Sequence, residues 1–348
     1  MRTFSALPAV LQSVAVGRIA MKVKTSGMPA IATFLAVSVG LGVPVHAASP
    51  PTFYNFTTID VLGASGNTEA FDINSAGKIV GAFGLRISGR PSQGFLYTDG
   101  SFITVDVPGA SETDARGINN AGRIVGVFST EGETGGHGYV RSTNGSFTTI
   151  DVPGATFGTG ASGINDRGQI VGGFTSSTAV HGFLLQTDGS FITIDVPGAT
   201  SADARGINNA GSIVGTFGTD TGGGGYVRST NGSFATIDVP GASGTSAYGI
   251  NDAGQIVGTF QTSGVDHGFL YSNGHFITID VPGARSTDAV GINNAGLIVG
   301  TFIDATTFAE RGFLATPVFA GTPGTANCHG QSVSALAKQY GGLNNAAA

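Results

Sequence analysis

Residues 117–128 read GINNAGRIVGVF, and near-copies of this stretch begin at residues 163, 206, 249 and 291. A sixth, more divergent copy, DINSAGKIVGAF, begins at residue 72, so the stretch returns every 42–46 residues. Each copy joins two apolar segments through Asn- and Gly-rich residues, which tolerate the positive φ of a tight turn. The stretch therefore predicts a β-hairpin, and its repetition predicts an array of similar units.

Each repeat contains two further strand signals. The segment FxTIDV precedes GIN, at residues 56–61, 102–107, 147–152, 191–196, 234–239 and 276–281. The segment GFLY or GYV follows IVGxF, at residues 94–97, 138–140, 182–185, 225–227, 268–271 and 312–314. Sequences such as TDG, TNG and SNG join GFLY to the next FxTIDV and are again typical of hairpins. One period therefore predicts a four-stranded antiparallel sheet.

Six sheets of this length predict an all-β protein, a six-bladed β-propeller over residues 53–318. A β-solenoid is the main alternative, but its coils are usually shorter and lack two tight hairpins per turn. The chain enters the array with FTTIDV at 56–61 and leaves it with RGFLATPV at 311–318, which no FxTIDV follows. We therefore expect the N-terminal strand to complete the last blade, which removes two exposed sheet edges.

The polarity of each segment predicts its place in the blade. IVGxF and GFLY are continuous apolar runs, as expected for strands covered on both faces by neighbouring blades. FxTIDV alternates polar and apolar residues, which suits an outer strand. GIN, with its small Gly, suits the crowded position beside the propeller axis.

The ends of the chain differ from the repeats. Residues 1–47 contain Lys22 and Lys24 ahead of an apolar run that ends in Val45-His46-Ala47, which predicts a cleaved signal peptide, with Met21 as an alternative start. An uncleaved membrane anchor is the alternative. Residues 319–348 have another composition and predict a partly helical or disordered tail, whose lone Cys328 has no internal disulfide partner.

Charge excludes some partners. Removal of residues 1–47 leaves 12 basic and 22 acidic residues, a net charge of −10. Such a chain is not expected to bind nucleic acid or anionic lipid through bulk electrostatics. We expect a secreted, extracellular or periplasmic protein that is a monomer and has no membrane contact after signal cleavage.

The repeats resemble those of the bacterial extracellular HAF family, named for a His-Ala-Phe tripeptide in the fourth segment. The recurring GIN-xxG-xIVG and TIDVPGA carry the resemblance over residues 53–316. The tripeptide is His181-Gly-Phe183 and His267-Gly-Phe269 here, with His137-Gly-Tyr139 as a variant. The resemblance implies a secreted bacterial protein and no established activity.

Strong catalytic signatures are missing from the sequence. It contains no HExxH, no paired CxxC, no phosphate loop ending in Gly-Lys-Ser/Thr and no G-x-S-x-G elbow. The glycines at 158–163 match a dinucleotide fingerprint only in spelling, because they lead into a strand rather than a helix. No cofactor is therefore required by the sequence.

Two residue types recur with the repeat, and internal repetition favours structural roles for both. The Asp of TIDVPGA is expected to accept backbone N–H groups and to fix the following turn; its copies are Asp60, Asp106, Asp151, Asp195, Asp238 and Asp280. His137, His181 and His267 occupy equivalent places in three blades, too far apart to share a zinc ion, and are expected to cap the rim.

Topology points to a better site. The loops after IVGxF and after TIDV open on one face, and variable loops on a rigid scaffold often carry function. Three residues before GIN, this face carries four carboxylates that we expect around the channel mouth, with Arg116 and Arg205 beside them: Glu69, Asp114, Asp203 and Asp288. Such carboxylates could hold Ca²⁺. The alternatives are solvated loop charges and pairs with the two arginines.

The sequence therefore predicts a non-catalytic binding or surface-interaction module that uses the variable-loop face, with a polysaccharide or an envelope protein as partner. The alternative is a propeller hydrolase or lyase, in which two mouth carboxylates converge and one stays protonated as general acid. A structural repeat protein without ligand is a third alternative.

Overall fold

A computed structural model describes residues 53–61, 67–84, 92–177 and 179–318. The predicted signal peptide, the predicted tail and Cys328 lie outside the described residues. The described part of the chain forms 24 strands and no helix.

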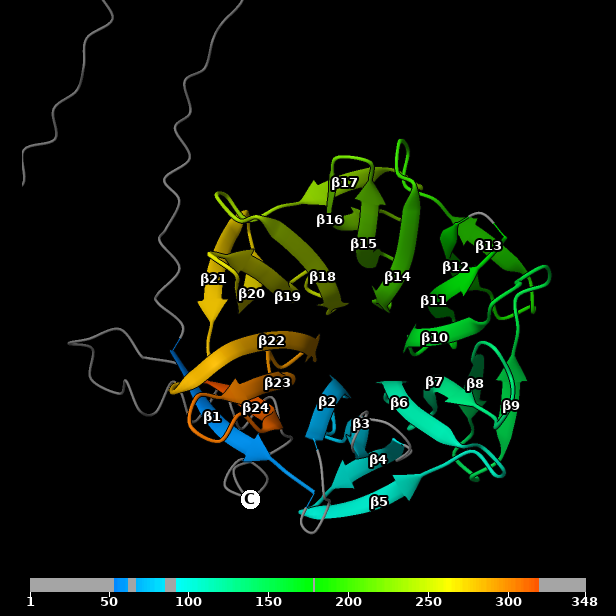
Figure 1. Cartoon of the computed structure of the whole chain (residues 1–348), viewed down its shortest axis with the longest axis horizontal. Coiled ribbons are helices and arrows are strands. Elements are labelled where there is room, and N and C mark those ends of the chain that lie inside the picture. The colour runs from blue at the N-terminus through cyan, green and yellow to red at the C-terminus, as the bar shows by residue number, and fades with distance from the viewer. Residues whose placement is uncertain (1–52, 62–66, 85–91, 178, 319–348) are drawn as a thin grey trace, which may run out of the picture. The chain divides into compact units, whose positions relative to one another are not determined.

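The strands form six four-stranded sheets arranged around a central axis (Figure 1). Blade 1 contains β2 (Asn67–Ile73), β3 (Ile79–Gly84), β4 (Gln93–Thr98) and β5 (Ser101–Val105). Blade 2 contains β6 (Glu112–Ile118), β7 (Ile124–Ser129), β8 (His137–Arg141) and β9 (Phe147–Ile150). Blade 3 contains β10 (Thr159–Ile164), β11 (Ile170–Thr175), β12 (Val180–Leu185) and β13 (Phe191–Ile194).

Blade 4 contains β14 (Ser201–Ile207), β15 (Ile213–Thr219), β16 (Gly222–Arg228) and β17 (Phe234–Ile237). Blade 5 contains β18 (Gly244–Ile250), β19 (Ile256–Thr262), β20 (Val265–Ser272) and β21 (His275–Ile279). Blade 6 contains β22 (Ala284–Ile292), β23 (Ile298–Asp304), β24 (Glu310–Val318) and, as its outer strand, β1 (Phe53–Ile59). β1 pairs with β24 in antiparallel register from Phe53↔Val318 to Ile59↔Gly312. The prediction of a six-bladed all-β propeller with four-stranded antiparallel blades is confirmed.

The radial order of the strands is also the predicted one. The GIN segments form the innermost strands, which surround the axis, and the FxTIDV segments form the outermost strands. Because neighbouring strands are antiparallel, the two tight hairpins of blades 1–5 and the single hairpin of blade 6 lie at one end of the channel, which we call the hairpin end. The connections between second and third strands and those between blades lie at the opposite end, which we call the loop end.

A repeated glycine–aromatic contact forms the core of each blade. The third strand of every blade carries a ring that is 0% exposed: Phe95, Tyr139, Phe183, Tyr226, Phe269 and Phe313. Each ring lies over the Gly of IVG in the second strand. At Gly258, an added Cβ would lie 1.9 Å from the backbone oxygen of Ser246 and 2.8 Å from the Phe269 ring. The close contact of strand and ring therefore requires glycine.

The hairpin end carries a closed ring of buried asparagines. The Asn of each GIN segment donates from Nδ2 to the backbone oxygen of its equivalent in the next blade, at 3.0–3.2 Å, and Asn293 donates to Asn74 to complete the cycle. The Oδ1 of each Asn accepts backbone N–H groups of its own turn; that of Asn208 accepts from Gly211 and Ser212. All six side chains are at most 6% exposed: Asn74, Asn119, Asn165, Asn208, Asn251 and Asn293.

Candidate functional site

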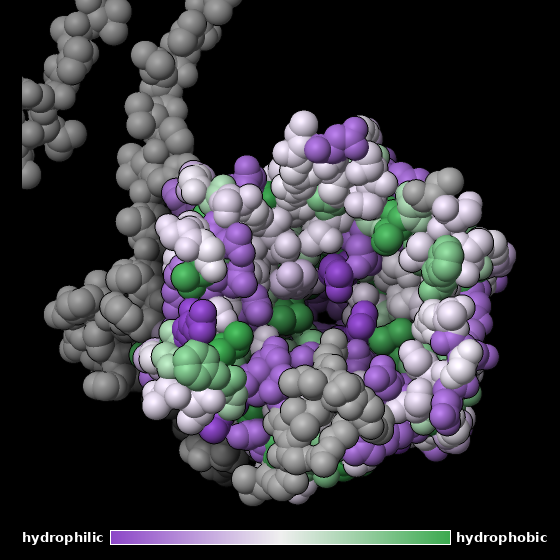
Figure 2. Space-filling view, in the orientation of Figure 1, coloured by the Kyte–Doolittle hydropathy of each residue, from purple (hydrophilic) through white to green (hydrophobic). Residues whose placement is uncertain are grey.

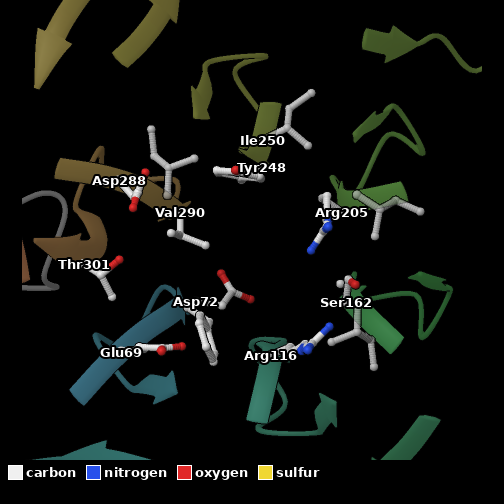
Figure 3. Close-up of a pocket in the computed structure, with 17 residues that line it drawn as sticks. Glu69, Asp72, Arg116, Ser162, Arg205, Tyr248, Ile250, Asp288, Val290 and Thr301 are labelled. Carbon is white, nitrogen blue, oxygen red and sulfur yellow. The ribbon is translucent and has the colours of Figure 1, made fainter. Parts of the chain in front are cut away.

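A cavity of about 300 Å³ opens at the loop end of the channel (Figure 3). The residue just before GIN contributes to this cavity in each blade, and its identity changes around the ring: Phe71, Arg116, Ser162, Arg205, Tyr248 and Val290. A space-filling view shows hydrophilic residues around a hollow near the centre of the ring (Figure 2). We call this cavity the channel mouth. It combines aromatic, cationic and anionic groups within a small volume.

Two of the four predicted carboxylates pair with the neighbouring arginines. Asp114 is only 6% exposed, lies 3.2 Å from Arg116 Nη2 and accepts from Ser92 Oγ of blade 1 at 3.0 Å. Asp203 lies 2.8 Å from Arg205 Nη2. Neither Asp114 nor Asp203 lines the cavity. The alternative that the sequence left open for these two acids, pairing with arginine, is therefore what the structure contains.

The other two predicted carboxylates, Glu69 and Asp288, do line the channel mouth. Asp288 accepts from Thr259 Oγ1 of blade 5 at 2.7 Å, and burial raises its pKa above the ordinary value. Like Asp114, it reaches toward the preceding blade. Asp114 and Asp288 thus each lie at an interface between two blades.

Within the described ranges, no group of three or more His, Cys, Asp or Glu side chains is arranged to hold a metal ion. The structure therefore does not bring Glu69, Asp114, Asp203 and Asp288 together as one ligand set. Calcium binding at the channel mouth remains a prediction from the sequence.

Asp72 is an acid at the channel mouth that was not among the predicted site residues. It replaces the Gly of GIN in blade 1 and lines the channel mouth and the smaller cavity at the hairpin end. Its Oδ1 accepts from Ile73 N and its Oδ2 from Ile118 N, both at 2.8 Å, so it links blades 1 and 2. Burial within the channel outweighs these hydrogen bonds and raises the pKa of Asp72 to about 7.

In the other five blades the position of Asp72 is a glycine, and close backbone contacts leave no room there for a side chain. An added Cβ at Gly117 would lie 2.8 Å from the backbone oxygen of Ser162, and one at Gly249 would lie 2.6 Å from that of Val290. Blade 1 alone accommodates a side chain here. Asp72 therefore places a carboxyl group where the repeat otherwise excludes one.

The recurring histidines and aspartates pair with each other on the outer part of the blades. Nδ1 of His137, His181 and His267 lies 2.7–2.9 Å from the Asp of the adjacent TIDV segment. Each imidazole also packs on a Phe ring of the second strand, with ring centroids 5.2–5.3 Å apart. The structural roles predicted for both residue types fit these contacts.

One detail predicted for the Asp of TIDVPGA is wrong, namely that it accepts the backbone N–H groups of the turn that follows it. The turn after TIDV is bonded through threonine: Val152 N donates to Thr159 Oγ1 and Val239 N to Thr245 Oγ1, both at 3.0 Å. The carboxylates accept mainly from side chains: Asp60 and Asp238 accept from Thr68 and Thr245 of the next blade's innermost strand. Asp106 accepts from Gln93 Nε2 and from Gly94 N, both on the third strand of its own blade.

Blade 3 places a serine beside its histidine. Ser176 Oγ lies 3.1 Å from His181 Nε2, and His181 Nδ1 lies 2.7 Å from Asp195. The same serine oxygen bonds both the N and the O of Ala179 at 3.2 Å. Blade 2 has Glu133 in this place beside His137. Ser176 thus closes the turn with Ala179. The His–Asp pair itself recurs in three blades with different neighbours, so we interpret the Ser176–His181–Asp195 contacts as structural.

Most of the residues that line the mouth were not predicted from the sequence. The predicted positions lie three residues before GIN, whereas the residues immediately before GIN vary more from blade to blade. Variation at one position of an otherwise regular repeat was the signal that could have identified Phe71 and Tyr248.

Comparison with known proteins supports the fold alone. No protein family matches the chain, and no curated protein matches its sequence. A protein of unknown function from Dyadobacter fermentans is similar with a TM-score of 0.51 and 11% identity, over 77% of this chain and 99% of that one. TolB from Acinetobacter baumannii is similar with a TM-score of 0.48 and 12% identity, over 73% of this chain and 66% of that one.

Virginiamycin B lyase from Staphylococcus aureus is similar with a TM-score of 0.41 and 13% identity, over 72% of this chain and 82% of that one. At these identities the likeness concerns the arrangement of strands. The described residues contain no helix of the length and apolarity needed to cross a membrane.

Proposed function

We propose that the protein is a secreted, non-catalytic binding module of the HAF-repeat type, whose channel mouth receives a chemical group of an extracellular partner. One observation carries this proposal: the six residues before GIN are of five different types and together line a cavity, while the GIN and IVG segments that follow them recur closely from blade to blade. Pockets of about 300 Å³ or more with a few polar groups among apolar ones are the usual form of ligand sites.

The charges of the mouth support a partner that both donates and accepts hydrogen bonds. Glu69 and Asp288 supply acceptors on blades 1 and 6, and Arg116 and Arg205 supply donors on blades 2 and 4. Tyr248 offers an apolar surface between them, with the Arg205 guanidinium 6.0 Å from its ring centroid. A polysaccharide of the envelope satisfies these demands through its hydroxyl groups and its apolar C–H faces.

The test is retention of the full chain on immobilised envelope polysaccharides and on envelope protein fractions. The double variant Glu69→Gln, Asp288→Asn removes both mouth charges without changing side-chain size, and we expect it to weaken retention by about tenfold. Asp252→Asn is the matched control, because Asp252 lies at the hairpin end. Absence of retention of the unmodified chain, or equal loss in the control, would contradict the proposal.

Calcium at the mouth is a separate prediction with its own measurement. If Glu69 and Asp288 hold Ca²⁺, melting of the protein in calcium should occur at a higher temperature than in chelator, because an ion that binds only the native state stabilises it. An unchanged melting temperature would leave these acids as ordinary polar groups of the mouth.

A hydrolase or lyase is the second candidate, and Asp72 is the observation that favours it. A carboxyl group with a pKa of about 7 beside Glu69 in one cavity has the protonation state required of a general acid. Incubation with the retained polysaccharide, followed by mass spectrometry of released fragments, distinguishes the two candidates. The enzyme requires fragments that Asp72→Asn abolishes, and the binding module requires none.

A further inference from the structure

Blade 4 lacks a side chain that every other blade has. The Phe of the second strand faces a polar residue on the third strand in five blades: Gln93, His137, His181, His267 and Arg311. In blade 4 the partner of Phe217 is Gly224. The outer-strand Asp238 consequently has no such partner and accepts from Thr245 Oγ1 at 3.1 Å.

The missing side chain leaves a groove between blades 4 and 5. Its volume is about 570 Å³, and Phe217 and Gly224 lie on one wall while Gly244, Gln261 and Asp266 lie on the other. Tyr248 and Asp288 line both this groove and the channel mouth. The groove and the channel mouth therefore adjoin at these two residues.

We propose that this groove binds a sugar unit of a neutral glycan chain whose adjoining unit lies in the channel mouth; the inference rests on the proposed function. The electron-rich face of Phe217, uncovered by Gly224, can pack against the C–H face of a pyranose ring. Thr216, Ser243 and Ser246 line the groove with hydroxyl groups that can bond those of the sugar. Thr245 and Thr259 are at most 8% exposed and already donate to Asp238 and Asp288.

The charges of the groove select against acidic sugars. Asp266 and Asp288 line it, and no Lys or Arg is among its lining residues. A carboxylate on the sugar would meet these two acids without a cation to offset the repulsion. Hydroxyl groups, in contrast, can donate to both carboxylates.

The histidines at the equivalent position of blades 2, 3 and 5 suggest a variant that closes the groove, Gly224→His. An added Cβ at Gly224 lies 3.3 Å from the Phe217 ring, whereas one at Gly223 lies 2.3 Å from the backbone oxygen of Phe217. Gly224→His should therefore stack on Phe217 and meet Asp238, as the histidine does in three sister blades. Gly244→Phe fills the groove from the opposite wall, where an added Cβ meets no atom within 4 Å.

The experiment is calorimetric titration of the full chain with a panel of neutral hexasaccharides (cello-, xylo-, manno-, malto- and chitohexaose) and with hexagalacturonate. We expect at least one neutral chain to bind with a Kd below about 1 mM, and each groove variant to weaken it about tenfold or more. Hexagalacturonate should bind more weakly than that neutral chain. His181→Gly, which opens the corresponding position in blade 3, is the control and should bind as the unmodified chain does.

Three results would contradict glycan binding in the groove. They are no binding of any neutral chain, unchanged binding in Gly224→His and Gly244→Phe with both variants folded, and tighter binding of hexagalacturonate than of any neutral chain. Retention on envelope fractions that persists in both groove variants and is lost in Glu69→Gln, Asp288→Asn would reject the groove alone. The proposed function would then stand without it.

Discussion

The two ends of the central channel are built from the same six inner strands, yet they differ in how closely the blades agree. At the hairpin end, six buried asparagines make the same hydrogen bond to the next blade, and the cycle closes on itself. At the loop end, Phe, Arg, Ser, Arg, Tyr and Val occupy one equivalent position. The regular end therefore links the blades to one another, and the variable end lines the larger cavity of the channel.

Replacement of a core glycine should have the largest effect on the regular part. Gly258→Ala forces a Cβ to within 1.9 Å of the Ser246 backbone oxygen, and backbone and ring must both move. We expect a loss of about 4 kcal/mol or more in the free energy of unfolding, measured by denaturant titration. Gly244→Ala, with no atom within 4 Å of the added Cβ, is the control and should change it by less than about 1 kcal/mol.

Removal of one asparagine from the ring should have the next largest effect. Asn208→Ala deletes the donor to Asn251 O and the side-chain acceptor of Ser212 N–H, whereas Gly211 N–H keeps its bond to the backbone oxygen of residue 208. A loss of about 2 kcal/mol is expected, since each polar group left unsatisfied costs about 1 kcal/mol or more. The neighbouring Asn209→Ala, which is more exposed, should cost about 1 kcal/mol or less. Equal losses would show that the buried ring has no special role.

Asp72 departs from the repeat, and its contribution should depend on pH. Its pKa of about 7 in the folded state lies above that of an unfolded Asp, so the folded state binds the proton more tightly. Stability should therefore be greatest below the unfolded pKa and should fall as pH rises toward about 7. Between about pH 5 and pH 7 the loss should be on the order of 2 kcal/mol.

Asp72→Asn is the variant that isolates this effect, because it retains the shape of the side chain without its titration. The difference in unfolding free energy between the two proteins should change from about pH 4, near the unfolded pKa, to just above pH 7, and should be nearly constant outside that range. Parallel pH profiles would show that Asp72 titrates as an ordinary surface acid.

The smallest change in unfolding free energy is expected from a substitution on the outer part of a blade. His181→Gln replaces a histidine whose side chain is 24% exposed with the residue that blade 1 uses at Gln93, and the side chain of its partner Asp195 is 60% exposed. Because solvent screens such pairs, the unfolding free energy should change by less than about 0.5 kcal/mol. A larger loss would give the outer His–Asp pairs a role that their exposure does not suggest.

The sequence predicts the fold well because hairpin chemistry and strand polarity are local properties that six copies repeat. The position of GIN beside the axis follows from the small size of its glycine. The site was harder to predict, because the direction of a side chain near a twisted blade edge depends on the neighbouring blade. Asp114 and Asp288 bond to Ser92 and Thr259 of preceding blades, contacts that sequence spacing does not reveal.

The most direct test of the account measures stability and retention on the envelope fractions in one pair of variants. Tyr248→Val gives blade 5 the mouth residue of blade 6, and Asn251→Ala breaks the ring at the hairpin end of the same strand. The account predicts that Tyr248→Val keeps the melting temperature and loses retention, whereas Asn251→Ala lowers the melting temperature and, while folded, is retained. Loss of stability in the first variant with unchanged retention would contradict it.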